Sequence, residues 1–211
     1  MFSEETTTIE ITARYNQERT HRYLIKRKFN EGKPEKSATI LMLNASNVSN
    51  LLHGDLTGMV VQNNLSALDF TEINIVNLFS LMQNKADLSG DLDSMTNETN
   101  TEVILECAKN SDVFVVAVGT VCRTYRKVAV VQDKLFERLR AAGLQSKVHT
   151  VEARDGTQGL HPISPKLREP GSWRLVPFAL PEPPKSTPEQ SQADTPDASS
   201  QGQKTEKKAK K

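Results

Sequence analysis

The chain has 211 residues, of which 27 are Lys or Arg and 26 are Asp or Glu, so its formal net charge is +1. This near-neutral balance excludes a strongly basic protein that coats nucleic acid and an acidic disordered chain. No apolar run approaches the roughly 18 residues that a membrane span needs. The acidic N-terminus is unlike a signal peptide, and Cys107 and Cys122 lack metal-site spacing. These features favour a cytoplasmic protein with free thiols.

The first two elements in chain order are expected to form an antiparallel hairpin, within residues 7–29. Residues 7–15 alternate between apolar and polar side chains, as do residues 22–29, and this alternation predicts half-buried strands. The polar link at residues 16–20 favours a turn between antiparallel partners. The apolar face of the second strand carries Tyr23, Ile25 and Phe29.

Four apolar runs follow the hairpin, and they lack its polar alternation. Three are continuous and the fourth is weaker; they occupy residues 38–43, 73–79, 113–118 and 148–151. Unbroken apolar runs are typical of strands that are covered on both faces, as in a parallel sheet.

Helical patterns separate these strands, at residues 56–65, 99–109 and 126–142. The second helix has capping-box spacing between Thr99 and Glu102, and the third is expected to end before Gly143. Alternating strands and helices predict a three-layer α/β/α domain with a mainly parallel central sheet, to which the N-terminal hairpin is added.

The C-terminal segment differs in composition from the rest of the chain. Residues 179–211 hold five of the ten prolines, few apolar residues and a Lys-rich end. This composition predicts a disordered tail, because too little apolar surface is present to form a core. We therefore expect a single α/β domain in residues 1–178, with its core in residues 38–165.

Polar residues stand at the ends of the predicted strands, where open parallel sheets bind their ligands. Asn44 and Ser46 follow the first apolar run, and Asn77 lies inside the second. Gly119 ends the third run, and His161 lies in the loop after the fourth. The motifs of phosphate-loop enzymes, dinucleotide-dependent oxidoreductases, serine hydrolases and zinc proteases do not occur, so these classes lose support.

Each candidate also has a purely structural interpretation. Asn44 could tie its own turn, and Asn77 could bond a neighbouring loop, because a buried amide needs a partner. His161 could be an ordinary loop histidine. Asp55 and Thr57 could simply begin the first helix. The residues alone leave both interpretations open.

Two basic stretches, at residues 14–28 and 123–154, could follow a phosphate backbone if they faced one side. A solvated protein surface is the alternative. The residues that we expect to contact nucleic acid are Arg22, Lys26, Arg126 and Lys127. The partners expected are DNA, RNA or a free nucleobase or nucleotide, and neither a cofactor nor a metal is expected.

Five short motifs occur in a fixed order between about residues 20 and 165. They are RYLIKR at residues 22–27, ILMLNAS at 40–46, VNLF at 76–79, VAVG at 116–119 and HP at 161–162. In this order and spacing they resemble the bacterial and phage family called domain of unknown function 1643. That family typically has Leu-Asn-Pro-Ser where this chain has Ala45 in place of the proline, and an Asp-x-Thr downstream, here Asp55 to Thr57.

The same motif order is more distantly similar to the uracil-DNA glycosylase superfamily. The resemblance implies that Asn44 orients the attacking water and that Asn77 reads the edge of a flipped base. It implies that His161 supports the negative charge that develops on the departing base. Phe79 is the nearest candidate for stacking on that base. The other substrate contacts expected are Ser46, Asp55, Thr57 and Gly119.

We therefore expect a protein that handles nucleobases or nucleic acid with a glycosylase-like fold, and hydrolysis of an N-glycosidic bond is its candidate reaction. The alternative is a non-enzymatic nucleic-acid-binding or regulatory module, phage-related, that keeps the pocket without the chemistry. Asn44, Asn77 and His161 at one sheet edge favour the first. Ala45 and the scarcity of carboxylates at that edge favour the second, so the sequence leaves catalysis open.

Overall fold

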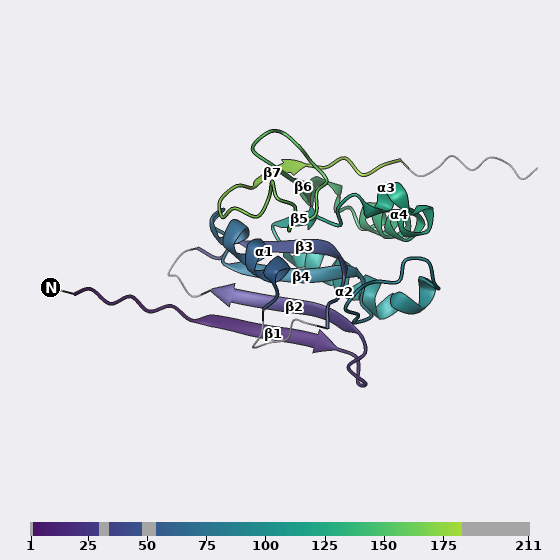
Figure 1. The fold of residues 1–211 in the computed structure, drawn as a ribbon, viewed down its shortest axis with the longest axis horizontal. Helices are drawn as coiled ribbons and strands as arrows, with labels where there is room; N and C mark the ends of the chain where they lie inside the picture. Colours follow the sequence, from purple (N-terminus) through teal and green to yellow (C-terminus); the bar gives the residue numbers. More distant parts are fainter. Residues whose placement is uncertain (1, 30–33, 48–53, 183–211) are drawn as a thin grey trace, which may run out of the picture.

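The computed structural model of the protein describes residues 2–29, 34–47 and 54–182. These residues form a mixed seven-stranded sheet in the order β1-β2-β4-β3-β5-β6-β7, which runs from bottom to top in Figure 1. The strands are β1 (Ile9–Tyr15), β2 (Arg22–Phe29), β3 (Ser37–Asn44), β4 (Glu72–Phe79), β5 (Val113–Val116), β6 (Val148–Glu152) and β7 (Arg174–Pro177). The helices of the described ranges are α1 (Leu56–Ser66), α2 (Glu98–Asn110), α3 (Val121–Thr124), α4 (Arg126–Ala141) and two 3-10 turns, η1 (Asp93–Met95) and η2 (Gln145–Lys147).

The sheet is mixed and not mainly parallel, which corrects the expectation from the sequence. β3 pairs in parallel with β4 and β5, and β5 pairs in parallel with β6. The β1–β2 hairpin, the β2–β4 pair and the β6–β7 pair are antiparallel. The four central strands are the four apolar runs. β7 was not predicted from the sequence. Its four residues are exposed or only half-buried, and they do not form an unbroken apolar run.

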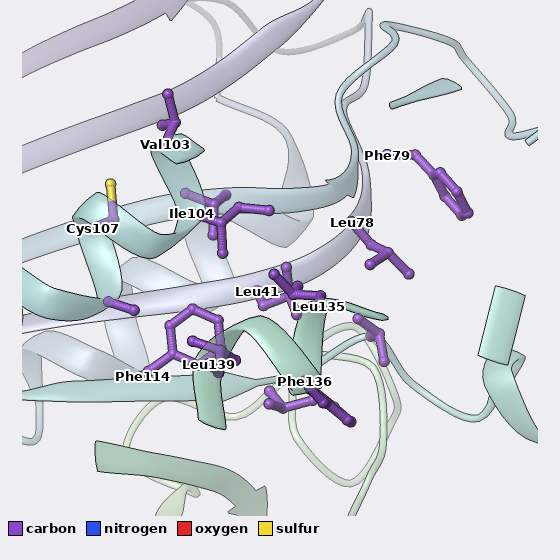
Figure 2. Close-up of a cluster of buried hydrophobic side chains, with 14 of the residues drawn as sticks. Leu41, Leu78, Phe79, Val103, Ile104, Cys107, Phe114, Leu135, Phe136 and Leu139 are labelled. Atoms are coloured by element: carbon purple, nitrogen blue, oxygen red, sulfur yellow. The ribbon is translucent and has the colours of Figure 1, made fainter. Parts of the chain in front are cut away.

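Helices pack against both faces of the sheet, and each face has its own apolar cluster. On one face, Val61 of α1 belongs to the same cluster as Ile40 of β3. On the other face, Leu41 of β3 packs in a cluster with Ile104 of α2 and Leu139 of α4 (Figure 2). Ile40 and Leu41 are neighbours in the chain, so β3 is buried on both sides. This two-sided burial explains why its sequence is apolar without alternation.

The helix ends show local capping chemistry. Asn97, two residues before the predicted Thr99, caps α2, and its side chain accepts a hydrogen bond from the backbone N–H of Asn100. The capping-box spacing therefore marked the right region but the wrong residue. α4 ends before Gly143, whose φ of +71° is readily adopted by glycine.

The segment after β7 continues along the body of the protein. The ring of Phe178 lies against that of Phe136, with centroids 5.9 Å apart, and Leu180 packs against the same core. Contacts with the core thus extend past the predicted boundary at residue 178. Residues 183–211, most of the predicted disordered tail, lie outside the described residues.

Within the described ranges, no helix combines the length and apolar character that crossing a membrane requires.

Candidate ligand-binding site

A cavity of about 520 Å³ lies at the edge of the sheet where β3 ends and α1 begins. Asn44 and Ser46, which follow the buried part of β3, line it. Asp55 and Thr57 at the start of α1 line it too, as does His161 from the loop after β6. Five residues that were selected from the sequence as substrate contacts or catalytic groups therefore share one cavity.

The sheet topology explains why these segments meet. β3 and β4 are parallel, so their C-terminal ends lie at the same edge. β2 is antiparallel to β4, so its first residue, Arg22, comes to this edge as well. The backbone N–H of Arg22 donates to the carbonyl oxygen of Ser80, just after β4, at 2.9 Å. Arg22, predicted from the sequence as a nucleic-acid contact, thus becomes part of the cavity wall.

Two buried arginines of β2 line the cavity. Arg22 is 3% exposed and Arg27 is 7% exposed. Nη1 of Arg22 donates to the backbone oxygen of Ser46 at 3.1 Å, and Nη1 of Arg27 donates to Oε1 of Gln62 on α1. Burial lowers the pKa of both guanidinium groups. Because the ordinary pKa of arginine lies far above 7, both groups remain cationic.

Positive charge exceeds negative charge among the described ionisable side chains of the cavity wall. Arg22, Arg27 and Lys85 are cationic, and Asp55 supplies the carboxylate. Oδ1 of Asp55 accepts a hydrogen bond of 2.6 Å from the backbone N–H of Gly58, which fixes the carboxylate as the N-cap of α1. The structural and functional interpretations of Asp55 are therefore compatible. The cavity as a whole suits an anionic ligand.

His161 contributes a neutral imidazole to the cavity wall. Burial lowers the pKa of His161 below its ordinary value of 6.5, and the nearby carboxylate of Asp55 acts in the opposite direction. Nδ1 of His161 accepts a long hydrogen bond, 3.4 Å, from the backbone N–H of Ile163. A neutral ring that accepts at Nδ1 carries its proton on Nε2. His161 can therefore donate one hydrogen bond from Nε2 to a ligand oxygen.

Gly119 does not line the cavity, but it lies directly beneath the His161 loop. Its φ is +78°, and a Cβ atom at this position would lie 3.0 Å from Cβ of His161. Such a distance is shorter than side chains tolerate without movement. The third apolar run thus ends in glycine both because of its backbone conformation and because the loop passes close to it.

The family profile described as "Protein of unknown function (DUF1643)" matches residues 22–163. The chain belongs to this family. The matched region begins at Arg22 and ends at Ile163, which are also the first and the last residues of the cavity wall. The family region therefore contains every segment that forms the cavity, whereas β1 and β7 lie outside it. No curated protein and no solved structure gives a significant match.

Two other candidates inside the family region lie away from the cavity wall. Asn77 is 1% exposed within β4, and its Oδ1 has no hydrogen-bond partner among the described residues. Phe79 is fully buried in the cluster formed with α2 and α4, where Figure 2 shows it near Leu78. Phe79 is thus part of the protein core and is not a stacking surface in the cavity.

The remaining predicted nucleic-acid contacts do not gather with Arg22. Lys26 forms an ion pair with Glu72, with 3.0 Å between Nζ and Oε1. Arg126 and Lys127 are exposed in the first turn of α4, and Lys127 borders a separate shallow hollow of about 300 Å³. The structure therefore divides the four basic residues between three places.

Arg27 is not among the residues predicted from the sequence, although its position in the strand gave a signal. In β2 the alternation places Arg27 on the same face as Ile25 and Phe29, so a charged residue interrupts an apolar face. A charge at a core position is uncommon and marks a candidate site. Lys85 gave no such signal, because it comes from a polar loop after β4.

We expect Gly119→Ala to reduce the free energy of unfolding and to disturb the cavity. A left-handed backbone costs alanine about 1–2 kcal/mol, and the new methyl group would also push against His161. Gly156→Ala is the matched control, because its φ is +81° and nothing lies within 4 Å of its Cβ position. Urea denaturation should show a larger loss for Gly119→Ala, and equal losses would show that the contact with His161 is unimportant.

Proposed function

We propose that the protein binds a nucleobase or nucleotide in this cavity, either as a free molecule or as part of DNA or RNA. The observation that carries the proposal is the cavity wall itself, which combines the predicted residues with two buried arginines. Its volume, about 520 Å³, falls within the range of roughly 300–1,000 Å³ that is usual for small-molecule sites. Ile25, Met42 and Ile75 supply an apolar wall against which a planar base can pack.

In the catalytic form of the proposal, the cavity hydrolyses an N-glycosidic bond. Departure of the base places negative charge on a carbonyl oxygen of the base, to which Nε2–H of His161 donates. Asn44 orients a water molecule, and the oxygen of Asp55 that does not cap α1 accepts the proton as the water attacks the sugar carbon. The proton then returns to the departed base, so that hydroxyl and proton both come from the water.

The alternative is a binding or regulatory module, phage-related, that lacks catalysis. Ala45, in place of the family's usual proline, is fully buried. The hydrogen bond from Nδ2 of Asn44 runs to the backbone oxygen of Ala45, at 3.4 Å, and Oδ1 of Asp55 is engaged as a helix cap. These contacts support the alternative, because they hold both side chains in their own loops.

The glycosylase likeness and the three-layer arrangement belong to the same proposal. Helices on both faces of the sheet support it.

The location that we propose is a reducing cytoplasm, which suits the two free cysteines. Burial raises the pKa of both Cys107 and Cys122 to about 11, so each thiol is weakly reactive.

Base release and ligand binding by the full chain test the proposal. We expect saturable binding of a nucleotide in calorimetric titration. Labelled single- and double-stranded oligonucleotides that contain uracil or other modified bases should release the base if the catalytic form holds. Binding without release would select the binding module. Absence of both binding and release at millimolar ligand would contradict the proposal, and an identically purified Asn44→Ala protein controls for contaminating enzymes.

A further inference from the structure

Arg27 is a buried cation without an ion-pair partner in the part of the chain that the structure describes. Its one hydrogen bond there is to the neutral side chain of Gln62 on α1. Its Nε atom is buried and has no hydrogen-bond partner among the same residues. The nearby carboxylate of Asp55 opposes the effect of burial on the pKa of Arg27, but it forms no ion pair with the guanidinium. A buried guanidinium that lacks a directly paired carboxylate is unfavourable for folding. A residue of this kind in a cavity wall is therefore a candidate for binding an anion.

The guanidinium of Arg27 lies against two glycines at the start of α1. A Cβ atom at Gly54 or Gly58 would lie 3.4 Å from Nη2 of Arg27, so the guanidinium reaches the first turn of this helix. The N-terminal end of an 11-residue helix carries a partial positive charge. Oδ1 of Asp55 already occupies the backbone N–H of Gly58 at this end, so the positive potential of the cavity comes chiefly from the arginines.

Arg22 brings a second buried guanidinium to the same cavity. With Lys85 and the single lining carboxylate of Asp55 included, the described ionisable groups of the wall carry a net charge of about +2, because His161 is neutral. A phosphate monoester carries about −1.5 to −2 at neutral pH. A carboxylate or an internal phosphodiester carries only one negative charge. Charge complementarity therefore selects the monoester.

We infer that Arg22 and Arg27 form a phosphate-monoester subsite beside the base-binding part of the cavity. The ligand class is then a nucleoside monophosphate or the phosphorylated end of a strand. A free base or an internal nucleotide would leave the subsite empty. This inference rests on the proposed function for the base, whereas the phosphate contact stands on the arginines alone.

Three ligands separate the two parts of the site in calorimetric titrations at low salt: deoxyuridine, deoxyuridine monophosphate and ribose 5-phosphate. We expect the monophosphate to bind at least about tenfold more tightly than the nucleoside, because charge-assisted hydrogen bonds are strong. Arg27→Gln should weaken monophosphate binding by about tenfold or more and weaken nucleoside binding far less. Arg14→Gln is the matched control, because Arg14 lies on β1 and pairs with Glu106 at 2.7 Å.

Thermal unfolding distinguishes a ligand-binding role of Arg27 from a structural one. Without ligand, Arg27→Leu should melt at the same temperature as the wild type or higher, because the variant no longer buries an unpaired charge. The monophosphate should raise the melting temperature of the wild type and not that of Arg27→Leu. A lower melting temperature of Arg27→Leu, together with unchanged monophosphate affinity of Arg27→Gln, would overturn the inference.

The ligand series also separates failure of the subsite from failure of the proposed function. Equal binding of nucleoside and monophosphate would overturn the subsite and leave base recognition standing. Binding of ribose 5-phosphate as tight as that of the monophosphate, with no binding of the nucleoside, would support the subsite and contradict base recognition. If none of the three binds at millimolar concentration, both are overturned.

Discussion

His161→Ala is expected to lower the rate of base release by about 100-fold, the usual effect of removing one well-placed donor to a developing negative charge. The imidazole lines the cavity, and its Nε2–H is the group available to the ligand. His161 comes from a loop and is only half-buried, so its loss should leave the melting temperature nearly unchanged. Kinetics of release from labelled oligonucleotides, with a thermal melt of each variant, measure both effects.

His149→Ala is the matched control, because His149 is also half-buried but lies on β6 and does not line the cavity. It should keep the wild-type rate. A wild-type rate in His161→Ala would show that the catalytic group lies elsewhere. If the wild type has no activity, the same pair of variants applies to nucleotide affinity, which His161→Ala alone should reduce.

Acid pH provides a second readout for His161. Burial lowers the pKa of His161 in the folded protein, so below about pH 6.5 the unfolded chain takes up the proton more readily than the folded one. The contribution of the neutral ring to stability is present above this range and is lost as the pH falls. The stability of the wild type relative to His161→Ala should therefore decrease between pH 7 and pH 5, as measured by urea denaturation.

Asn100→Ala is expected to reduce the free energy of unfolding by about 2–4 kcal/mol, because two buried backbone oxygens would lose a partner. Asn100 of α2 is 1% exposed. Its Nδ2 lies 3.0 Å from the backbone oxygen of Asn77 and 3.3 Å from that of Leu78. This single amide therefore ties α2 to the C-terminal half of β4.

The position of Asn100 coincides with a gap in the pairing of β2 with β4, where β3 stays paired with β4. The ladder between β2 and β4 ends at the pair Ile25 and Ile75, and hydrogen bonding resumes between Arg22 and Ser80. The carbonyl groups that Asn100 serves lie between these two points. Loss of the amide should thus loosen the strand end beside the cavity as well as the attachment of α2.

Asn110→Ala is the control for Asn100→Ala, because it changes the exposed last residue of the same helix. Surface changes of this kind usually alter stability by less than about 0.5 kcal/mol. Urea denaturation of both variants at neutral pH gives the comparison. A loss below about 1 kcal/mol in Asn100→Ala would mean that water replaces the amide at the two carbonyls.

Local residue patterns were sufficient to predict most elements, because they depend on neighbours along the chain. The alternation of β2 and the unbroken apolar runs of β3, β4 and β5 identified these strands. The direction in which two strands pair does not follow from these local patterns. β7 is antiparallel to β6 because the loop between them brings the chain back along β6 in the opposite direction. The mixed sheet could not be derived from the runs themselves.

The residues of the candidate site also fall into two groups, those predicted from the sequence and those whose position only the fold determines. The sequence by itself determined that polar residues follow the strands, and Asn44, Asp55 and His161 do line one cavity. Only the tertiary structure decided that Phe79 turns into the core, although it too ends a strand. The direction of a side chain at a strand end depends on twist and on the helix packed there, and neither is encoded by spacing.

Arg27 shows this limit most clearly. Arg27 lies on the same face of β2 as Ile25 and Phe29, but it was not among the residues predicted from the sequence. What that face covers was decided by the strand order β2-β4-β3 and by α1, whose first turn lies over Arg27. The cavity is formed by segments that are distant in the chain. Its net charge therefore depends on the sheet order, which brings Arg22, Arg27 and Asp55 together.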